Sequence, residues 1–256
     1  MHNQEYRQRD KDQVNRIVRA IYKRLGIIHL GRRRVRDLAD FIEDRKIDLV
    51  IDVGANIGQF GESLRAGGYR GKIVSFEPIE SAFQALSIKA AADGNWEVHH
   101  CGLGAASGAA TLNVSELSVF SSILGMTSVA GLHDSRMVVD HTEQIPIQTL
   151  DQVAAGLSGR MFLKIDTQGY ERQVIEGGQR TIPRMMGILM ELPIIHVYDG
   201  EWQFHEALKF MAETGFVPAQ IQPVNYHGAD NVSAVEFDCL FRPLGQVDGP
   251  SNPEKS

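Results

Sequence analysis

Apolar residues follow two periods along this chain, and the two alternate from residue 47 onward. Short runs rich in Val, Ile and Leu are typical of strands buried on both faces of a parallel sheet. Apolar residues at helical spacing separate these runs. Strands are predicted at residues 48–53, 72–77, 97–101, 161–166, 187–192, 216–221 and 235–241, and helices at 59–66, 81–92, 170–176 and 202–213. The alternation predicts an α/β fold with a doubly wound sheet, in which a ligand lies across the carboxyl ends of the strands.

Three regions depart from this alternation. Residues 1–46 predict a basic helical extension with helices at 13–25 and 35–44, ahead of one domain at 47–245. Residues 108–113 predict a strand or hairpin edge, and the irregular stretch at 115–144 is long enough for a binding segment or lid. The polar residues 246–256, with their glycine and prolines, predict a disordered tail.

Composition is that of an ordinary globular protein, with 43% hydrophobic and 23% charged residues. No apolar run reaches the eighteen residues of a membrane span, and the N-terminus is polar, so we expect a cytoplasmic protein without signal peptide or anchor. Cys101 and Cys239 fall in predicted strands and are expected to be buried thiols.

Charge is distributed unevenly between the extension and the rest of the chain. Residues 1–46 carry thirteen Lys and Arg against seven Asp and Glu, while the whole chain has a net charge of −6. A solvated helix face is the simplest interpretation of this basic segment. The alternatives are an anionic substrate or peripheral contact with a membrane surface. A nucleic-acid partner is not predicted, because no reading module accompanies the charge.

Candidate chemistry centres on residues 48–59, where the first strand ends at a glycine turn. Gly54 and Gly58 permit positive φ and close backbone approach, and the next helix is expected to begin there with unpaired amide donors. Asp52 precedes the first glycine by two positions and would repel a phosphate, so the turn favours a cationic cofactor such as S-adenosylmethionine. Glu77 ends the second strand, where a carboxylate can accept hydrogen bonds from two ribose hydroxyls.

Four segments in order resemble the FkbM family of class I S-adenosylmethionine-dependent methyltransferases: residues 52–58, 76–78, 102–104 and 162–171. The resemblance implies a Rossmann-like, seven-stranded sheet with one antiparallel strand. It also implies methylation of a hydroxyl on a sugar or natural product. The chain departs from the family at Gln168, where relatives usually have glutamate. The cofactor-binding residues predicted from motif and strand position are Asp52, Gly54, Asn56, Gly58, Glu77, Pro78, Gly102, Leu103 and Asp166.

Catalytic candidates lie after the fourth and fifth strands. His196 or Glu191 is predicted to be the base that takes the acceptor proton, with Asp166 near the sulfonium or orienting the acceptor. The alternative is magnesium held by Asp166, Gln168 and Glu191, which would lower the pKa of the acceptor hydroxyl. Substrate-binding candidates are Ser121, Ser122, Gln168 and Tyr198.

The predicted function is therefore methyl transfer to a hydroxyl of a sugar in a glycolipid, polysaccharide or glycosylated natural product. Three alternatives remain at this point. They are methylation of another small-molecule oxygen or nitrogen, cofactor binding without catalysis, and RNA methylation with the basic arm as the binding surface. The chain contains no Asn/Asp-Pro-Pro-Tyr amine motif, which argues against base methylation.

Overall fold

The computed structural model describes residues 38–134, 136–226 and 232–245. The predicted helix at 13–25 and the tail at 246–256 lie outside the described residues. Of the second predicted helix, the structure describes α2 (Leu38–Asp44). The chain divides into two units between Phe41 and Ile42, and the architecture below belongs to the second. Among the described residues, no helix is both long enough and apolar enough to cross a membrane.

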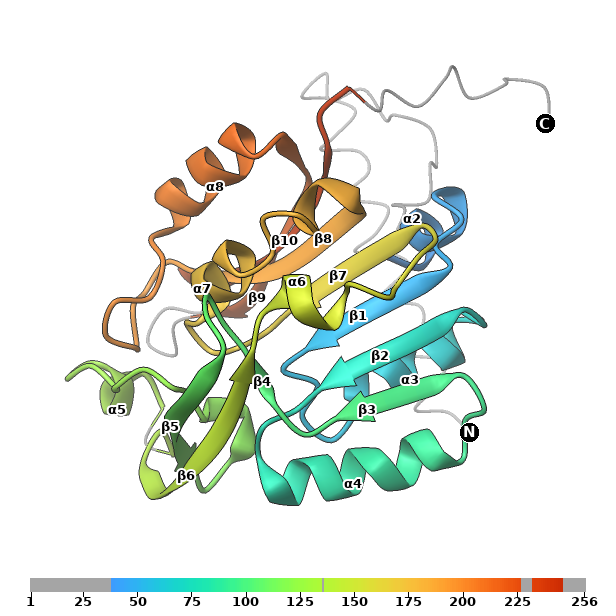
Figure 1. Ribbon diagram of the computed structural model, residues 1–256. Helices are drawn as coiled ribbons and strands as arrows, with labels where there is room; N and C mark the ends of the chain where they lie inside the picture. Colours follow the sequence, from blue (N-terminus) through green and yellow to red (C-terminus); the bar gives the residue numbers. More distant parts are fainter. Residues whose placement is uncertain (1–37, 135, 227–231, 246–256) are drawn as a thin grey trace, which may run out of the picture. The chain divides into compact units, whose positions relative to one another are not determined.

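A seven-stranded sheet with the order β3-β2-β1-β7-β8-β10-β9 forms the centre of this unit (Figure 1). Neighbouring strands from β3 to β8 are parallel. Strand β10 pairs antiparallel with both β8 and β9, so it alone among these seven strands is reversed, as the sequence predicted. Its strands are β1 (Leu49–Val53), β2 (Lys72–Phe76), β3 (Trp96–His99), β7 (Met161–Ile165), β8 (Met185–Pro193), β9 (Phe216–Tyr226) and β10 (Ala234–Pro243).

Every residue of β1 and β7 is buried, which explains why both strands appear in the sequence as almost continuous apolar runs. Helices cover both faces of the sheet, with α6 and α7 on the near face of Figure 1 and α3 on the far face. The helices are α3 (Gln59–Ala66), α4 (Glu80–Ala91), α5 (Ala130–His133), α6 (Leu150–Val153), α7 (Glu171–Glu176) and α8 (Phe204–Glu213), with short 3-10 turns η1 (Ser118–Phe120) and η2 (Ile182–Arg184).

A second sheet of three strands, in the order β4-β6-β5, stands beside the first (Figure 1). It consists of β4 (Gly102–Leu103), β5 (Gly108–Ser115) and β6 (Val139–Gln148). The prediction of an irregular stretch to residue 144 is wrong, because β6 pairs antiparallel with β5. Only Ile145 and Ile147 of β6 are buried, so most of the strand lacks the apolar alternation that would reveal it.

The third predicted strand also ends earlier than expected. Strand β3 stops at His99, and Gly102 belongs to β4 of the second sheet. Cys101 lies between the two strands rather than within one. Both cysteines are nevertheless free and buried, in agreement with the prediction, and burial raises the pKa of Cys101 to about 11 and that of Cys239 to about 12.

Candidate functional site

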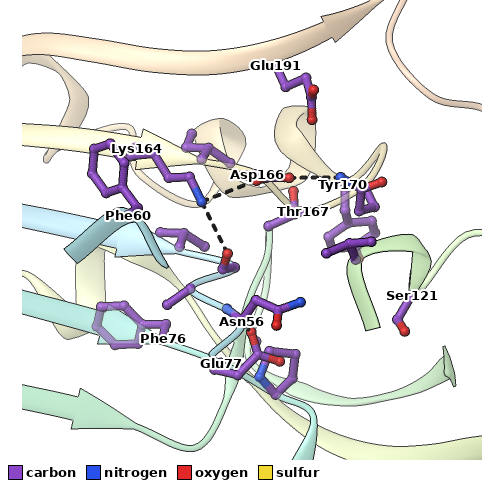
Figure 2. Close-up of a pocket in the computed structure, with 18 of the residues that line it drawn as sticks. Asn56, Phe60, Phe76, Glu77, Ser121, Lys164, Asp166, Thr167, Tyr170 and Glu191 are labelled. Atoms are coloured by element: carbon purple, nitrogen blue, oxygen red, sulfur yellow. Dashed lines mark hydrogen bonds and ion pairs between the residues drawn. The ribbon is translucent and has the colours of Figure 1, made fainter. Parts of the chain in front are cut away.

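A cavity of about 370 Å³ opens at the carboxyl ends of β1, β2 and β7. This is the edge at which a doubly wound sheet binds ligands. Figure 2 shows the side chains that line it, with Lys164 and Asp166 on one side and Asn56 and Glu77 on the other. Of the residues singled out in the sequence, those lining the cavity are Gly54, Asn56, Glu77, Pro78, Gly102, Leu103, Ser121, Asp166, Gln168 and Glu191.

Glu77 is held rigidly at this cavity by backbone amides. Its Oε2 accepts a hydrogen bond from the Asn56 amide at 2.7 Å, and its Oε1 accepts one from the Ile79 amide at 2.9 Å. Burial raises the pKa of Glu77 to about 7, against the lowering effect of these amides. Each carboxylate oxygen has a further lone pair available, so both oxygens can still accept from a diol.

The amides of the glycine turn itself, residues 54–58, all have partners, whereas the sequence prediction concerned the first amides of the helix that follows, and it stays a prediction. The amides of Gly54 and Ala55 both donate to the carbonyl of Phe76, and the Gly58 amide donates to the carbonyl of Ala55. The Ile57 amide donates to Oδ1 of Asn56. With its amides engaged internally or on Glu77, the turn is built to hold a carboxylate and lacks the donor nest that cradles a phosphate.

Asp52 lies beneath the cavity and does not line it. Its side chain is fully buried, with Oδ1 3.3 Å from Nζ of Lys164 and Oδ2 accepting from the Ser75 hydroxyl at 3.3 Å. Burial raises the pKa of Asp52, and the Lys164 ammonium opposes that rise. Asp52 was predicted to bind the cofactor. In the structure it does not line the cavity, and its link to the cavity is the ion pair with Lys164.

Lys164 lines the first cavity and pairs with two carboxylates there, although it was not among the residues predicted from the sequence. Its ammonium lies 3.3 Å from Oδ2 of Asp166, donates to the carbonyl of Gly54 at 3.2 Å, and sits 5.6 Å from the ring centroid of Phe60 (Figure 2). Burial opposes its charge, but Asp166 and Asp52 together raise the pKa of Lys164 above its ordinary value. The only signal in the sequence is a lysine within an otherwise apolar strand, because such a residue seldom becomes buried without a charged partner.

Asp166 and Gln168 form the wall on the opposite side of the cavity from Glu77. Nε2 of Gln168 donates to Oδ1 of Asp166 at 2.8 Å, while the other carboxylate oxygen faces Lys164. Both side chains also line a second cavity of about 230 Å³. The two cavities therefore adjoin along this wall.

Glu191 also lines both cavities. Figure 2 shows its carboxyl projecting from the strand above Thr167 and Tyr170. Burial, followed by the charges of Asp166, Glu236 and Asp238, raises the pKa of Glu191 to about 9. A carboxyl with so high a pKa is positioned to exchange a proton near neutral or mildly alkaline pH.

The second cavity is polar and acidic. Burial raises the pKa of Glu201 to about 7, and its Oε1 accepts from the amides of Val197 and Tyr198. The acidic side chains of this cavity are Asp166, Glu171, Glu191, Glu201 and Glu236. Among the described residues that line it there is no Lys, Arg or His.

Three of the four predicted substrate-binding residues line a cavity. Ser121 lines the first, Tyr198 the second and Gln168 both. Ser122 lines neither, because its hydroxyl donates to the carbonyl of Gln168 at 2.6 Å and accepts from the Leu124 amide at 3.0 Å. Its role is to hold the loop. Ser118, from the same stretch, does line the first cavity and pairs with Asn56.

Two further predicted residues, His196 and Gly58, line neither cavity. His196 lies outside both linings although it is only three residues beyond β8, and its carbonyl accepts from the Thr127 hydroxyl. Gly58 has φ +90°, and a Cβ there would approach Leu86 to 2.9 Å, so the glycine serves packing beneath α3. We therefore do not retain His196 as the base or Gly58 as a cofactor contact.

The predicted magnesium site finds no support. Within the part of the chain that the structure describes, no group of three His, Cys, Asp or Glu side chains could hold a metal ion. The predicted ligands are also poorly suited to a cation. The oxygens of Asp166 already face the Lys164 ammonium and the Gln168 amide, and Glu191 favours its protonated form.

The first cavity fits S-adenosylmethionine by its donor set. Glu77 suits the ribose diol, the carboxyls of Asp166, Glu191 and Asp238 suit the cationic end, and Lys164 is already paired with two carboxylates. The apolar wall that would receive an adenine ring is formed by Phe76, Pro78, Ile79, Leu103 and Leu112.

The sheet order, with the reversed strand next to the edge, is that of the class I methyltransferase fold. The model of the methyltransferase FkbM domain matches residues 52–218. This chain belongs to the FkbM methyltransferase family, as its motifs predicted. No curated protein matches the chain.

Solved structures with this fold share little sequence with the chain. A methyltransferase FkbM from Methylobacillus flagellatus KT is 14% identical with a TM-score of 0.48; the match covers 77% of this chain and 43% of that one. The 1,6-didemethyltoxoflavin-N1-methyltransferase of Burkholderia thailandensis, bound to S-adenosylhomocysteine, is 11% identical with a TM-score of 0.44, over 92% and 90% of the two chains. Fibrillarin of Aeropyrum pernix, with natively bound S-adenosyl-L-methionine, is 11% identical with a TM-score of 0.45, over 76% and 66%. The chain thus spans less than half the length of the Methylobacillus protein.

Proposed function

We propose that this protein is an S-adenosylmethionine-dependent O-methyltransferase whose acceptor is a hydroxyl of a sugar in a glycolipid, polysaccharide or glycosylated natural product. The observation that carries the proposal is Glu77. Its carboxylate is held by two backbone amides at a cavity whose glycine turn has no amide nest for a phosphate. That arrangement favours a ribose diol with a cationic remainder over a pyrophosphate.

The cofactor, when bound, supplies a methyl group already activated by its sulfonium. The chain's own residues must orient the acceptor oxygen and take its proton. Glu191 is the base we propose, since its carboxyl lines both cavities. Its raised pKa makes it a strong proton acceptor once ionised, and the positive charge of a cofactor bound beside it would favour the ionised form. Asp166 lies on the shared wall and orients the acceptor from the other side. A positioned base contributes about 10²–10⁴-fold to the rate.

A sugar acceptor is supported by the lining of the second cavity. It offers the hydroxyl of Tyr198, the amide of Gln168 and several carboxyls, which are groups that hydrogen-bond a polyol. The carboxyls and the lack of Lys, Arg or His among its described lining residues disfavour an anionic sugar. We therefore propose a neutral or amine-bearing sugar over a uronate or a sugar phosphate.

Calorimetry and a labelled-methyl assay test this function on the full chain. S-adenosylmethionine and S-adenosylhomocysteine should both bind, and label should pass to oxygen in a panel of neutral deoxysugar glycosides while matched uronates remain unlabelled. Binding of a nicotinamide dinucleotide in place of either sulfur compound would overturn the cofactor assignment. Label found on nitrogen, or on uronates alone, would overturn the acceptor assignment.

A further inference from the structure

Gln168 occupies a strained backbone position between the two cavities. Its φ of +53° lies in the left-handed region, which a residue other than Gly, Asn or Asp seldom adopts. The turn is held from both sides. Oε1 of Glu171 accepts from the amides of Thr167 and Gly169, and the Ser122 hydroxyl donates to the carbonyl of Gln168 at 2.6 Å. A strained residue held this firmly points to a function for its side chain.

The side chain of Gln168 makes one contact toward each cavity. Nε2 donates to Oδ1 of Asp166 at 2.8 Å, and Oε1 lies 3.2 Å from the hydroxyl of Tyr198. Asp166 lines both cavities, whereas Tyr198 lines the second and not the first. A single amide therefore joins a carboxylate beside the cofactor cavity to a hydroxyl inside the acceptor cavity.

We infer that the Gln168 amide is a positioning residue that couples the cofactor cavity to the acceptor cavity, by holding Asp166 and Tyr198 in one fixed arrangement. The inference rests on the proposed function, since it assigns the two cavities to cofactor and acceptor.

The chemistry of an amide explains why this residue type stands here. The amide donates through nitrogen and accepts through oxygen at the same time, so it can satisfy a carboxylate and a hydroxyl together. An ionised glutamate at this position could accept from Tyr198 but could not donate to Asp166, and it would place a second negative charge beside that carboxylate. Tyr198 is 3% exposed, and the single proton of its hydroxyl is shared between Oε1 of Gln168 and the carbonyl of Phe120, which lies 3.1 Å away.

A double-mutant cycle with S-adenosylhomocysteine binding as the readout tests this coupling and needs no knowledge of the acceptor. Tyr198→Phe removes a hydroxyl that lies outside the cofactor cavity. In the wild-type background it should weaken binding about fivefold, the size of one net hydrogen bond. Gln168→Asn tolerates the positive φ but is too short to span both partners, and Tyr198→Phe in that background should change affinity less than twofold.

Two further variants serve as controls for the double-mutant cycle. Tyr69→Phe removes a hydroxyl that donates to the carbonyl of Lys72 at the far end of β2, and it should leave affinity unchanged. Gln168→Met gives a second background without an amide, and thermal unfolding checks that each variant folds. If Tyr198→Phe changes affinity equally in the wild-type, Gln168→Asn and Gln168→Met backgrounds, the coupling is overturned and the proposed function still stands. Failure of the wild-type chain to bind either sulfur compound overturns the proposed function and the coupling with it.

Discussion

At the scale of single residues, the site shows how environment separates carboxyls of the same type. Burial raises the pKa of Glu77 and of Glu201 to about 7. The rise stops there because backbone amides donate to each carboxylate and favour its ionised form. No hydrogen-bond or ion-pair partner is found for the Glu191 carboxyl among the described residues, and neighbouring acids push its pKa further, to about 9. Glu77 is thereby suited to binding, and Glu191 to proton transfer.

The raised pKa of Glu191 predicts a pH-dependent stability. Between about pH 4.5 and pH 9 the folded chain binds this proton more tightly than the unfolded chain, so the free energy of unfolding falls as pH rises. Glu191→Gln removes that loss. We expect its melting temperature to match wild type near pH 4.5 and to exceed it at pH 8 by about 10 °C, because each pH unit in this range costs the wild type about 1.4 kcal/mol.

Calorimetric scans at the two pH values measure this difference, with the exposed Glu213→Gln as control. The same Glu191→Gln variant should lose about 10²–10⁴-fold in kcat if the carboxyl is the base. A melting temperature that is lowered at pH 8 would contradict the raised pKa, and unchanged kcat would remove Glu191 from the chemistry.

At the scale of elements, the site depends on how closely the ends of β1 and β7 approach. The Asp166 amide donates to the carbonyl of Val53, and Gly54 turns away at φ +73°. A Cβ on Gly54 would come within 1.8 Å of the carbonyl oxygen of Asp166. The glycine therefore allows the two strand ends to place Asp166 and Lys164 beside the cofactor cavity.

Gly54→Ala should separate these strand ends. We expect it to lower the free energy of unfolding by about 3–5 kcal/mol, from overpacking together with positive-φ strain, and to abolish binding of S-adenosylhomocysteine. Gly68→Ala is the matched control, because Gly68 has φ +94° but no atom lies within 4 Å of its Cβ position. The control should cost about 1–2 kcal/mol and leave binding intact. Denaturant unfolding that gives the two variants equal losses would show that close approach is unimportant.

At the scale of the whole molecule, negative charge converges on the two cavities. The chain carries 32 Asp and Glu against 26 Lys and Arg. Among the described residues that line either cavity, Lys164 is the single basic side chain. It joins Asp52 of β1 to Asp166 beyond β7 at the centre of the sheet. The lining of the two cavities, as far as the structure describes it, is therefore net acidic in spite of Lys164, which suits a cationic cofactor.

The Asp52–Lys164 pair should be costly to break singly. Lys164→Met leaves Asp52 buried without its cation, and we expect a loss of about 3–5 kcal/mol in the free energy of unfolding. Asp52→Asn with Lys164→Met removes both charges and should recover most of that loss. Urea unfolding of the single and double variants measures both, and a double variant no more stable than Lys164→Met would show that the pair is not coupled.

Local sequence pattern is enough to predict part of this structure. Buried strands, the helices after them and the carboxylate at the end of β2 follow from periodicity and turn residues, which act within a few positions of one another. The family motifs could also be identified from the sequence, because each is a short continuous segment at a strand end.

The contacts between distant side chains could not be predicted in this way, because they depend on the folded domain. Lys164 acquires its role from Asp52, 112 residues earlier, and Gln168 from Tyr198, 30 residues later, and no local period records either pairing. Strand β6 forms because β5 lies beside it, although its own sequence is mostly polar. His196 lines neither cavity, although its neighbours Ile195 and Val197 line the second one, so nearness in sequence did not place its side chain there. Contacts across a sheet depend on strand order and register, which are set by the packing of the whole domain.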